Sequence, residues 1–190
     1  MKTGKKYIIM CVGHTHNGKT TFARKFVDQV KNIILVDNDD VASFINKTYP
    51  LAVFSEYNKV KRTYKDPNLK FLLAQDIFKF CLKAGLNVIH CSGNLGKNAR
   101  LVITKNAKKY NYELITIYFN LPREVILERL NNSKKDTIVF KSAKKWSEVL
   151  AKQDLYAELP PSQKNTIYFE IKNSKDYQEV FNKVKEIVNK

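Results

Sequence analysis

The stretch Gly13-His14-Thr15-His16-Asn17-Gly18-Lys19-Thr20 decides the fold expected for this chain of 190 residues. An apolar run, Tyr7–Val12, precedes it without polar alternation, as expected for a strand buried on both faces of a parallel sheet. Lys19–Val30 follows with a helical pattern. The stretch matches G-x-x-x-x-G-K-[ST] at every fixed position, and it lies between a strand and a helix. That is the context which this phosphate-binding motif requires.

The chemistry of a phosphate-binding loop accounts for these residue types. Glycines let the backbone wrap around phosphates, while the loop amides and the helix N-terminus attract a triphosphate. We expect Lys19 to reach the β- and γ-phosphates, Thr20 to ligate Mg²⁺ and Thr21 to contact the α-phosphate. The expected cofactors are therefore ATP and Mg²⁺. The expected nucleotide-binding residues are Gly13, His14, Thr15, His16, Asn17, Gly18, Lys19, Thr20 and Thr21.

Strand-like and helix-like segments alternate along the rest of the chain. Further strands are expected at Asn32–Val36, Asn87–Cys91, Glu113–Asn120 and Thr166–Ile171. Helices are expected at Lys70–Lys83, Lys97–Lys109, Pro122–Leu130, Lys141–Leu155 and Asp176–Val188. This alternation predicts a three-layer α/β sandwich with a mostly parallel sheet. Residues 1–190 are expected to form a single domain, with a short lid at about 131–140.

A group of carboxylates, Asp37-Asn38-Asp39-Asp40, follows the second expected strand. Side chains at the carboxyl end of a strand beside the loop lie where α/β sheets bind ligands. In a kinase, an acid at this place accepts or aligns the proton of the attacking hydroxyl. The same residues also suit the first turn of a helix, where Asp is favoured by hydrogen bonding and by the helix dipole. The two interpretations are compatible.

From about Tyr7 to Pro160, the sequence resembles the P-loop kinases grouped around bacteriophage polynucleotide 5′-hydroxyl kinase and the zeta-toxin-like small kinases. The resemblance rests on Gly18–Arg24 (G-K-T-T-F-A-R), on Asn38-Asp39-Asp40, on Val88–Leu95 (V-I-H-C-S-G-N-L) and on the segment from Leu121-Pro122 into the lid. It implies a kinase-type P-loop fold. It also implies that the first acid of the Asp39-Asp40 pair is the general base.

The resemblance and the motif together define the candidate site. The candidate catalytic residues are Lys19, Asp39, Arg129 and Lys135, and the candidate metal ligands are Thr20 and Asp37. The candidate acceptor-binding residues are Asp40, Arg62, Asn94 and Arg100.

Three departures separate the sequence from this family's pattern. Cys91 or Ser92 stands where the family has an acid that helps to hold the metal or the substrate, so Asp37 or Asp39 would have to compensate. Ala42 stands where an Arg serves the acceptor. The lid offers Lys134 and Lys135 instead of Arg, and Lys cannot form the bidentate fork to phosphate.

The formal net charge of +16 is the most unusual feature of the composition. It indicates a polyanionic partner such as nucleic acid. The alternative is a bias towards A/T-rich codons. Most of the cations are Lys, and Asn, Ile and Tyr, which also have A/T-rich codons, are abundant. Residues 49–68 form a basic stretch with interleaved aromatics, which suits single-stranded nucleic acid, although a solvated Lys-rich helix explains it equally well.

These observations predict an ATP-dependent phosphotransferase acting on a hydroxyl. A polynucleotide 5′-OH is the first acceptor considered, and a small molecule or nucleotide sugar is the second. A regulatory ATP-binding module with degraded catalysis is the alternative of another class. No apolar run approaches the roughly 20 residues of a membrane helix, so no membrane partner is expected. The odd number of cysteines, with no C-x-x-C pair, favours a reducing, cytoplasmic location.

Overall fold

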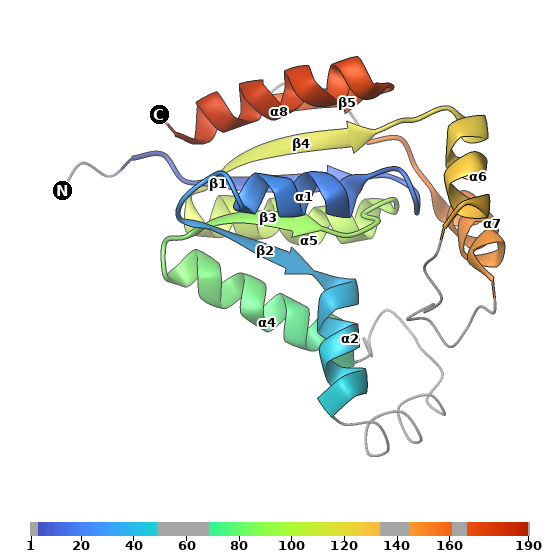
Figure 1. Cartoon of the computed structure of the whole chain (residues 1–190). Coiled ribbons are helices and arrows are strands. Elements are labelled where there is room, and N and C mark those ends of the chain that lie inside the picture. The colour runs from blue at the N-terminus through green and yellow to red at the C-terminus, as the bar shows by residue number, and fades with distance from the viewer. Residues whose placement is uncertain (1–3, 49–68, 134–144, 161–166, 190) are drawn as a thin grey trace.

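The sheet at the centre of the computed structural model has five parallel strands in the order β2-β3-β1-β4-β5. The structure describes residues 4–48, 69–133, 145–160 and 167–189 (Figure 1). The strands are β1 (Tyr7–Val12), β2 (Ile33–Asp37), β3 (Asn87–Cys91), β4 (Glu113–Phe119) and β5 (Ile167–Ile171). Because the first strand lies in the middle, the loop that follows it opens near the centre of the carboxyl edge.

Helices cover both faces of this sheet, which confirms the expected three-layer sandwich. The helices are α1 (Lys19–Val27), α2 (Asn38–Thr48), α4 (Leu69–Lys83), α5 (Lys97–Tyr110), α6 (Arg123–Asn131), α7 (Trp146–Tyr156) and α8 (Ser174–Val188). Helices α1 and α8 pack on one face, and α2, α4 and α5 contribute to the core on the other. Helices α6 and α7 stand at the carboxyl edge, on the right in Figure 1. None of the helices in the described ranges is both long and apolar enough to cross a membrane.

Strand β1 shows why its apolar run has no polar alternation. Ile9 and Cys11 belong to the core beneath α1 and α8, whereas Ile8, Met10 and Val12 belong to the core beneath α4 and α5. Each residue of the strand is buried, since a parallel sheet covered on both sides leaves neither face to water.

The element boundaries differ from the predicted ones in places where local backbone geometry decides them. Helix α1 ends at Val27, before a turn in which Asn32 takes the left-handed conformation, with φ of 58°. Helix α2 was anticipated only as a first turn at the acids and extends to Thr48. Helix α7 begins at Trp146, and residues 141–144 lie outside the described ranges. The bounds of the other described elements agree with the predicted ones within two residues.

A buried histidine on β3 makes the stability of the fold sensitive to acid. His90 packs edge-on against Phe78, with ring centroids 5.3 Å apart, and Asn94 Nδ2 lies 3.4 Å from its Nδ1. Burial lowers the pKa of His90 to about 4. Between pH 6.5 and 4, the unfolded chain therefore binds a proton that the folded chain does not, and stability falls as the pH falls.

We expect His90→Gln to remove this part of the pH dependence. The free energy of unfolding of the wild type should fall by about 3 kcal/mol relative to the variant between pH 6.5 and 4, as the shift of the His90 pKa requires. Urea unfolding at a series of pH values measures the difference. Parallel pH profiles for the two proteins would contradict the prediction.

Candidate active site

The loop after β1 depends on two glycines for its shape. Gly13 has φ of 149°, and a Cβ there would overlap the Asn17 amide and lie 2.7 Å from the Phe119 carbonyl oxygen. Asn17 Nδ2 instead donates a 2.8 Å hydrogen bond to that oxygen, which ties the loop to the end of β4. Gly18 has φ of 93° and caps α1. These conformations disfavour any residue with a side chain at the two fixed glycine positions.

Lys19 lies folded beneath the loop. Its Nζ donates to the His14 carbonyl oxygen at 2.5 Å and to Asn17 Oδ1 at 3.0 Å. The residue is buried, and this burial lowers the pKa of its ammonium group. A cation held by two neutral oxygens in a buried place is poised for an anion such as a phosphate.

The hydroxyl of Thr20 lies close to the end of β2. Thr20 Oγ1 is 3.4 Å from Asp37 Oδ2 and 3.8 Å from Cys91 Sγ. Asp37 is buried, and burial raises the pKa of its carboxyl group, although the Asp39 amide donates to Asp37 Oδ1 at 2.8 Å. A buried carboxylate beside a hydroxyl is the oxygen donor set that Mg²⁺ takes in nucleotide sites, so these residues fit the expected ion.

The other two acids point in different directions. Asp39 is half exposed and lines the cavity described below, with its Oδ1 3.8 Å from Lys70 Nζ. Asp40 Oδ1 pairs with Arg24 Nη2 at 2.6 Å on the surface. Asp40 is not among the described residues that line the cavity, so the structure places it away from the acceptor position predicted for it.

Two of the predicted acceptor-binding residues, Arg100 and Asn94, form hydrogen bonds within the protein. Arg100 is buried, and its guanidinium donates to the carbonyl oxygens of Asn94, Leu95 and Glu158. Asn94 takes the left-handed conformation, and its amide donates to the Cys11 carbonyl oxygen at 2.8 Å. Asn94 lines the cavity and Arg100 is not among its described lining residues, and the polar atoms of both hold the loop after β3 to its neighbours. Their sequence positions agree with the family pattern, whereas their contacts do not indicate acceptor binding.

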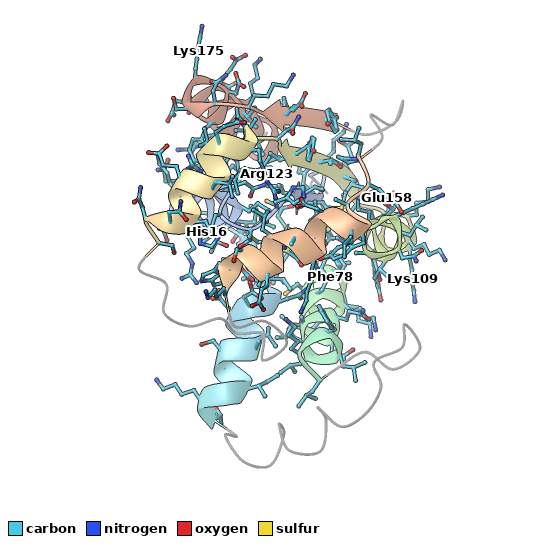
Figure 2. All side chains as sticks on the ribbon, turned by 90° about the vertical axis from the view of Figure 1, so that its right-hand side faces the viewer. His16, Phe78, Lys109, Arg123, Glu158 and Lys175 are labelled. Atoms are coloured by element: carbon cyan, nitrogen blue, oxygen red, sulfur yellow. The ribbon has the colours of Figure 1, made fainter. Side chains whose placement is uncertain are left out.

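Helix α7 supports the phosphate loop from outside. Gln153 Oε1 accepts a 2.8 Å hydrogen bond from the Thr15 amide. Asp154 Oδ1 lies 3.1 Å from His14 Nε2, and Asp154 Oδ2 lies 2.8 Å from Arg123 Nη2 on α6. Figure 2 faces the carboxyl edge of the sheet and shows α6 and α7 crossing in front of it, with His16 and Arg123 labelled near them. No local pattern in the sequence indicates the contacts of α7 with Thr15 and His14, because they join segments more than 100 residues apart.

Arg129 and Trp146 complete the cover over the loop. Arg129 Nη1 lies 3.4 Å from the His16 carbonyl oxygen and reaches across Gly18. Trp146 is half-buried at the loop, edge-on to His16 with ring centroids 5.0 Å apart. Its large ring fills space at the edge of the cavity. Lys135, Arg62 and most of the predicted lid lie outside the described residues.

These groups surround a cavity of about 880 Å³. Residues 15–21 of the loop and the residues Leu121, Arg129 and Tyr177 line one part of it. Residues 37–39, Lys70, Phe71 and residues 91–99 line the remainder. Gly13 and His14, predicted as nucleotide-binding residues, are not among the described lining residues and shape the loop from behind. The cavity is large enough for a nucleotide and a second small group.

Lys70 is a cavity residue that is not among the predicted site residues. It is buried near the start of α4, and its Nζ lies 4.9 Å from the centre of the Phe71 ring. It occupies the same helix face as the buried residues Ala74 and Phe78. The sequence does contain a signal for Lys70, namely a lysine on the apolar face of a predicted helix. A charged side chain is rarely buried there without a partner.

Comparisons with known proteins agree with this geometry. A family profile described as an AAA domain matches residues 8–160. The chain belongs to this AAA-domain family. No curated protein matches the sequence.

Solved structures share the fold of this AAA-domain chain at low sequence identity. A sugar kinase from Janibacter sp. HTCC2649 has 16% identity and a TM-score of 0.62, covering 98% of this chain and 95% of its own. The APS kinase of Mycobacterium tuberculosis, in complex with AMPPNP and APS, has 13% identity and a TM-score of 0.62, with 98% and 99% covered. A chain of the Pnkp1/Rnl/Hen1 complex has 19% identity and a TM-score of 0.52, with 73% and 43% covered. The fold is therefore that of P-loop kinases.

The single tryptophan of the AAA-domain chain gives a direct signal for ligand binding at the loop. Because Trp146 touches His16, phosphates on the loop should alter the surroundings of its ring. We expect a saturable change in tryptophan emission on titration with AMPPNP, and loss of the signal in Trp146→Phe. Binding of a radiolabelled nucleotide without any change in emission would contradict this placement of Trp146.

Proposed function

We propose that this AAA-domain protein transfers the γ-phosphate of ATP to the 5′-hydroxyl of a polynucleotide. The observation that carries the proposal is the shared cavity. Lys19 and Thr20 line it together with Asp39, so a phosphate donor on the loop and a hydroxyl near the carboxylate would meet in one enclosed space. Positioning and charge stabilisation are the main contributions a protein makes to phosphoryl transfer.

Each of these residues has a separate role in the proposed phosphoryl transfer. The Lys19 ammonium stabilises negative charge on the β- and γ-phosphates as the bond to the departing ADP oxygen breaks. Asp39 accepts the proton of the attacking hydroxyl while the oxygen of that hydroxyl bonds to phosphorus. Thr20 and Asp37 would hold Mg²⁺, which supplies further charge neutralisation on the phosphates. Arg129, on α6, adds a guanidinium above the loop.

The distribution of charge supports a polynucleotide as the acceptor. Helix α5 carries no acidic residue, and its exposed lysines are Lys97, Lys105, Lys108 and Lys109. Helix α8 has three lysines and three acids, so its charges balance whereas those of α5 do not. Lys97 lines the cavity, and Lys109 lies at the other end of α5, where Figure 2 shows it pointing outward. A row of cations that continues from the cavity suits the phosphates of a single strand.

Phosphate transfer from γ-labelled ATP tests the proposal. The purified protein with Mg²⁺ should label a 5′-hydroxyl oligonucleotide and leave a 5′-phosphorylated one unlabelled, and Lys19→Met should label neither. Labelling of a sugar or a nucleotide instead would favour the small-molecule alternative. Nucleotide binding without transfer to either class of acceptor would favour a regulatory ATP-binding module. The absence of an acid at Cys91, beside Asp37, supports that alternative.

The proposed setting of this activity is the cytoplasm. The thiols of Cys11, Cys81 and Cys91 are all free and buried, as in proteins that fold under reducing conditions.

A further inference from the structure

The end of β3 brings a thiol to the place where the nucleotide's cation is expected. Cys91 is the register partner of Asp37 on β2 and of Cys11 on β1. Partners in a parallel ladder project their side chains from the same face of the sheet, here the face that α1 covers. Thr20, in the first turn of α1, faces two of these side chains.

The distances fit ligands that share one ion. Ligands at about 2.1 Å (oxygen) and about 2.3 Å (sulfur) from one cation stand about 3.1 Å apart at right angles and about 3.6 Å apart in a tetrahedron. Cys91 Sγ is 3.8 Å and Asp37 Oδ2 is 3.4 Å from Thr20 Oγ1. Both distances from Thr20 Oγ1 are within a few tenths of an ångström of the spacing expected for two ligands of one ion. All three residues line the cavity.

We propose that Cys91 is a ligand of the divalent cation that accompanies the nucleotide, and that the site, whose Thr20 and Asp37 oxygens also suit Mg²⁺, therefore binds a borderline cation such as Mn²⁺, Co²⁺ or Zn²⁺ more tightly than Mg²⁺. The inference rests on nucleotide binding in the proposed function and is independent of the acceptor. Sulfur ligands favour softer ions, whereas Mg²⁺ demands oxygen. On binding, the Cys91 thiol loses its proton to solvent and the sulfur bonds to the ion.

Cys11 is placed to support such a ligand. It is the register partner of Cys91 on the neighbouring strand, and both side chains are buried in the same core. The Cys11 thiol can therefore donate to the Cys91 sulfur, as outer partners do for metal ligands. Within the described residues, no group of three His, Cys, Asp or Glu side chains could hold a metal ion alone. The cation is consequently expected to bind only with the nucleotide, whose phosphate oxygens complete its shell.

Co²⁺ spectroscopy tests the thiol ligand without any turnover. Co²⁺ with AMPPNP should produce a thiolate-to-metal charge-transfer band in the wild type, saturating at one equivalent, and no band without AMPPNP. The band should disappear in Cys91→Ser and persist in Cys81→Ser, whose thiol lies on α4 in the opposite core. In Cys91→Ser, the affinity ratio of Co²⁺ to Mg²⁺ should fall about tenfold or more, since sulfur favours Co²⁺.

The outcomes separate this inference from the proposed function. A wild-type protein that binds AMPPNP and Co²⁺ without the band, or a band that survives in Cys91→Ser, overturns the thiol ligand and leaves the kinase proposal intact. If the emission of Trp146 shows that AMPPNP does not bind at all, both the thiol ligand and the kinase proposal are overturned. Cys91→Asp provides a second variant, because a carboxylate in place of the thiol should reverse the preference towards Mg²⁺.

Discussion

Replacing Lys19 with Met is expected to lower the rate of phosphate transfer by about 10³-fold or more, the largest effect expected of any single change. Removing one preorganised donor from a developing charge costs roughly 10²–10³-fold in enzymes, and Lys19 carries a full charge on a buried amine. Met retains most of the aliphatic stem, so the fold should survive. The rate is measured by transfer from γ-labelled ATP at saturating acceptor.

The control for Lys19→Met is Lys31→Met, which removes an exposed lysine from the turn before β2. It should retain wild-type activity within about twofold, as surface changes usually do. Because burial already opposes the charge of Lys19, the melting temperature of Lys19→Met should not fall sharply. A Lys19→Met protein that is folded and transfers phosphate at the wild-type rate would show that the loop does not act as a catalytic phosphate site.

Replacing Asp39 with Asn is expected to give the second largest effect, a fall in kcat of about 10²–10⁴-fold, the range in which general bases contribute. The amide has nearly the shape of the carboxylate but cannot accept the proton of the hydroxyl. The KM for ATP should stay within about twofold, because Asp39 lies beyond the loop on the side of Lys70 and Phe71.

Asp40→Asn is the matched control for Asp39→Asn, since it changes the adjacent acid of the same helix. Asp40 pairs with Arg24 on the surface, and an exposed pair contributes about 1 kcal/mol or less to stability. Activity should therefore remain near that of the wild type. Equal losses of kcat in the two variants, or a larger loss in Asp40→Asn, would contradict the assignment of Asp39 as the general base.

The fold could be predicted from the sequence because its signals are local. Buried strands such as Tyr7–Val12 have no polar alternation, and Gly13 and Gly18 mark a loop whose backbone angles disfavour side chains. Helix α2 was harder to delimit, because its acids fit both a ligand site and a first turn.

The site could be predicted only as far as the motif extends. Lys19, Thr20 and Asp39 all line the shared cavity, because they follow β1 and β2, two parallel strands that flank β3 and end at the same edge of the sheet. Arg100 and Asn94 match the family's spacing, yet spacing does not reveal that their side chains are engaged with backbone carbonyls. The contacts of α7 carry no sequence signal, since hydrogen bonds between distant segments depend on the completed fold.

The support that α7 gives to the loop has a consequence for synthesis of the chain on the ribosome. Thr15 and its partner Gln153 are 138 residues apart, so at about 5–20 residues per second roughly 7–28 s separate their translation. The links from Asn17 to Phe119 and from His16 to Arg129 also form late, since they span 102 and 113 residues. A nascent chain that stops before α7 contains the whole motif, Phe119 and Arg129, but it lacks Gln153 and with it the support of the Thr15 amide. Nucleotide capture is therefore expected to begin only near the end of translation.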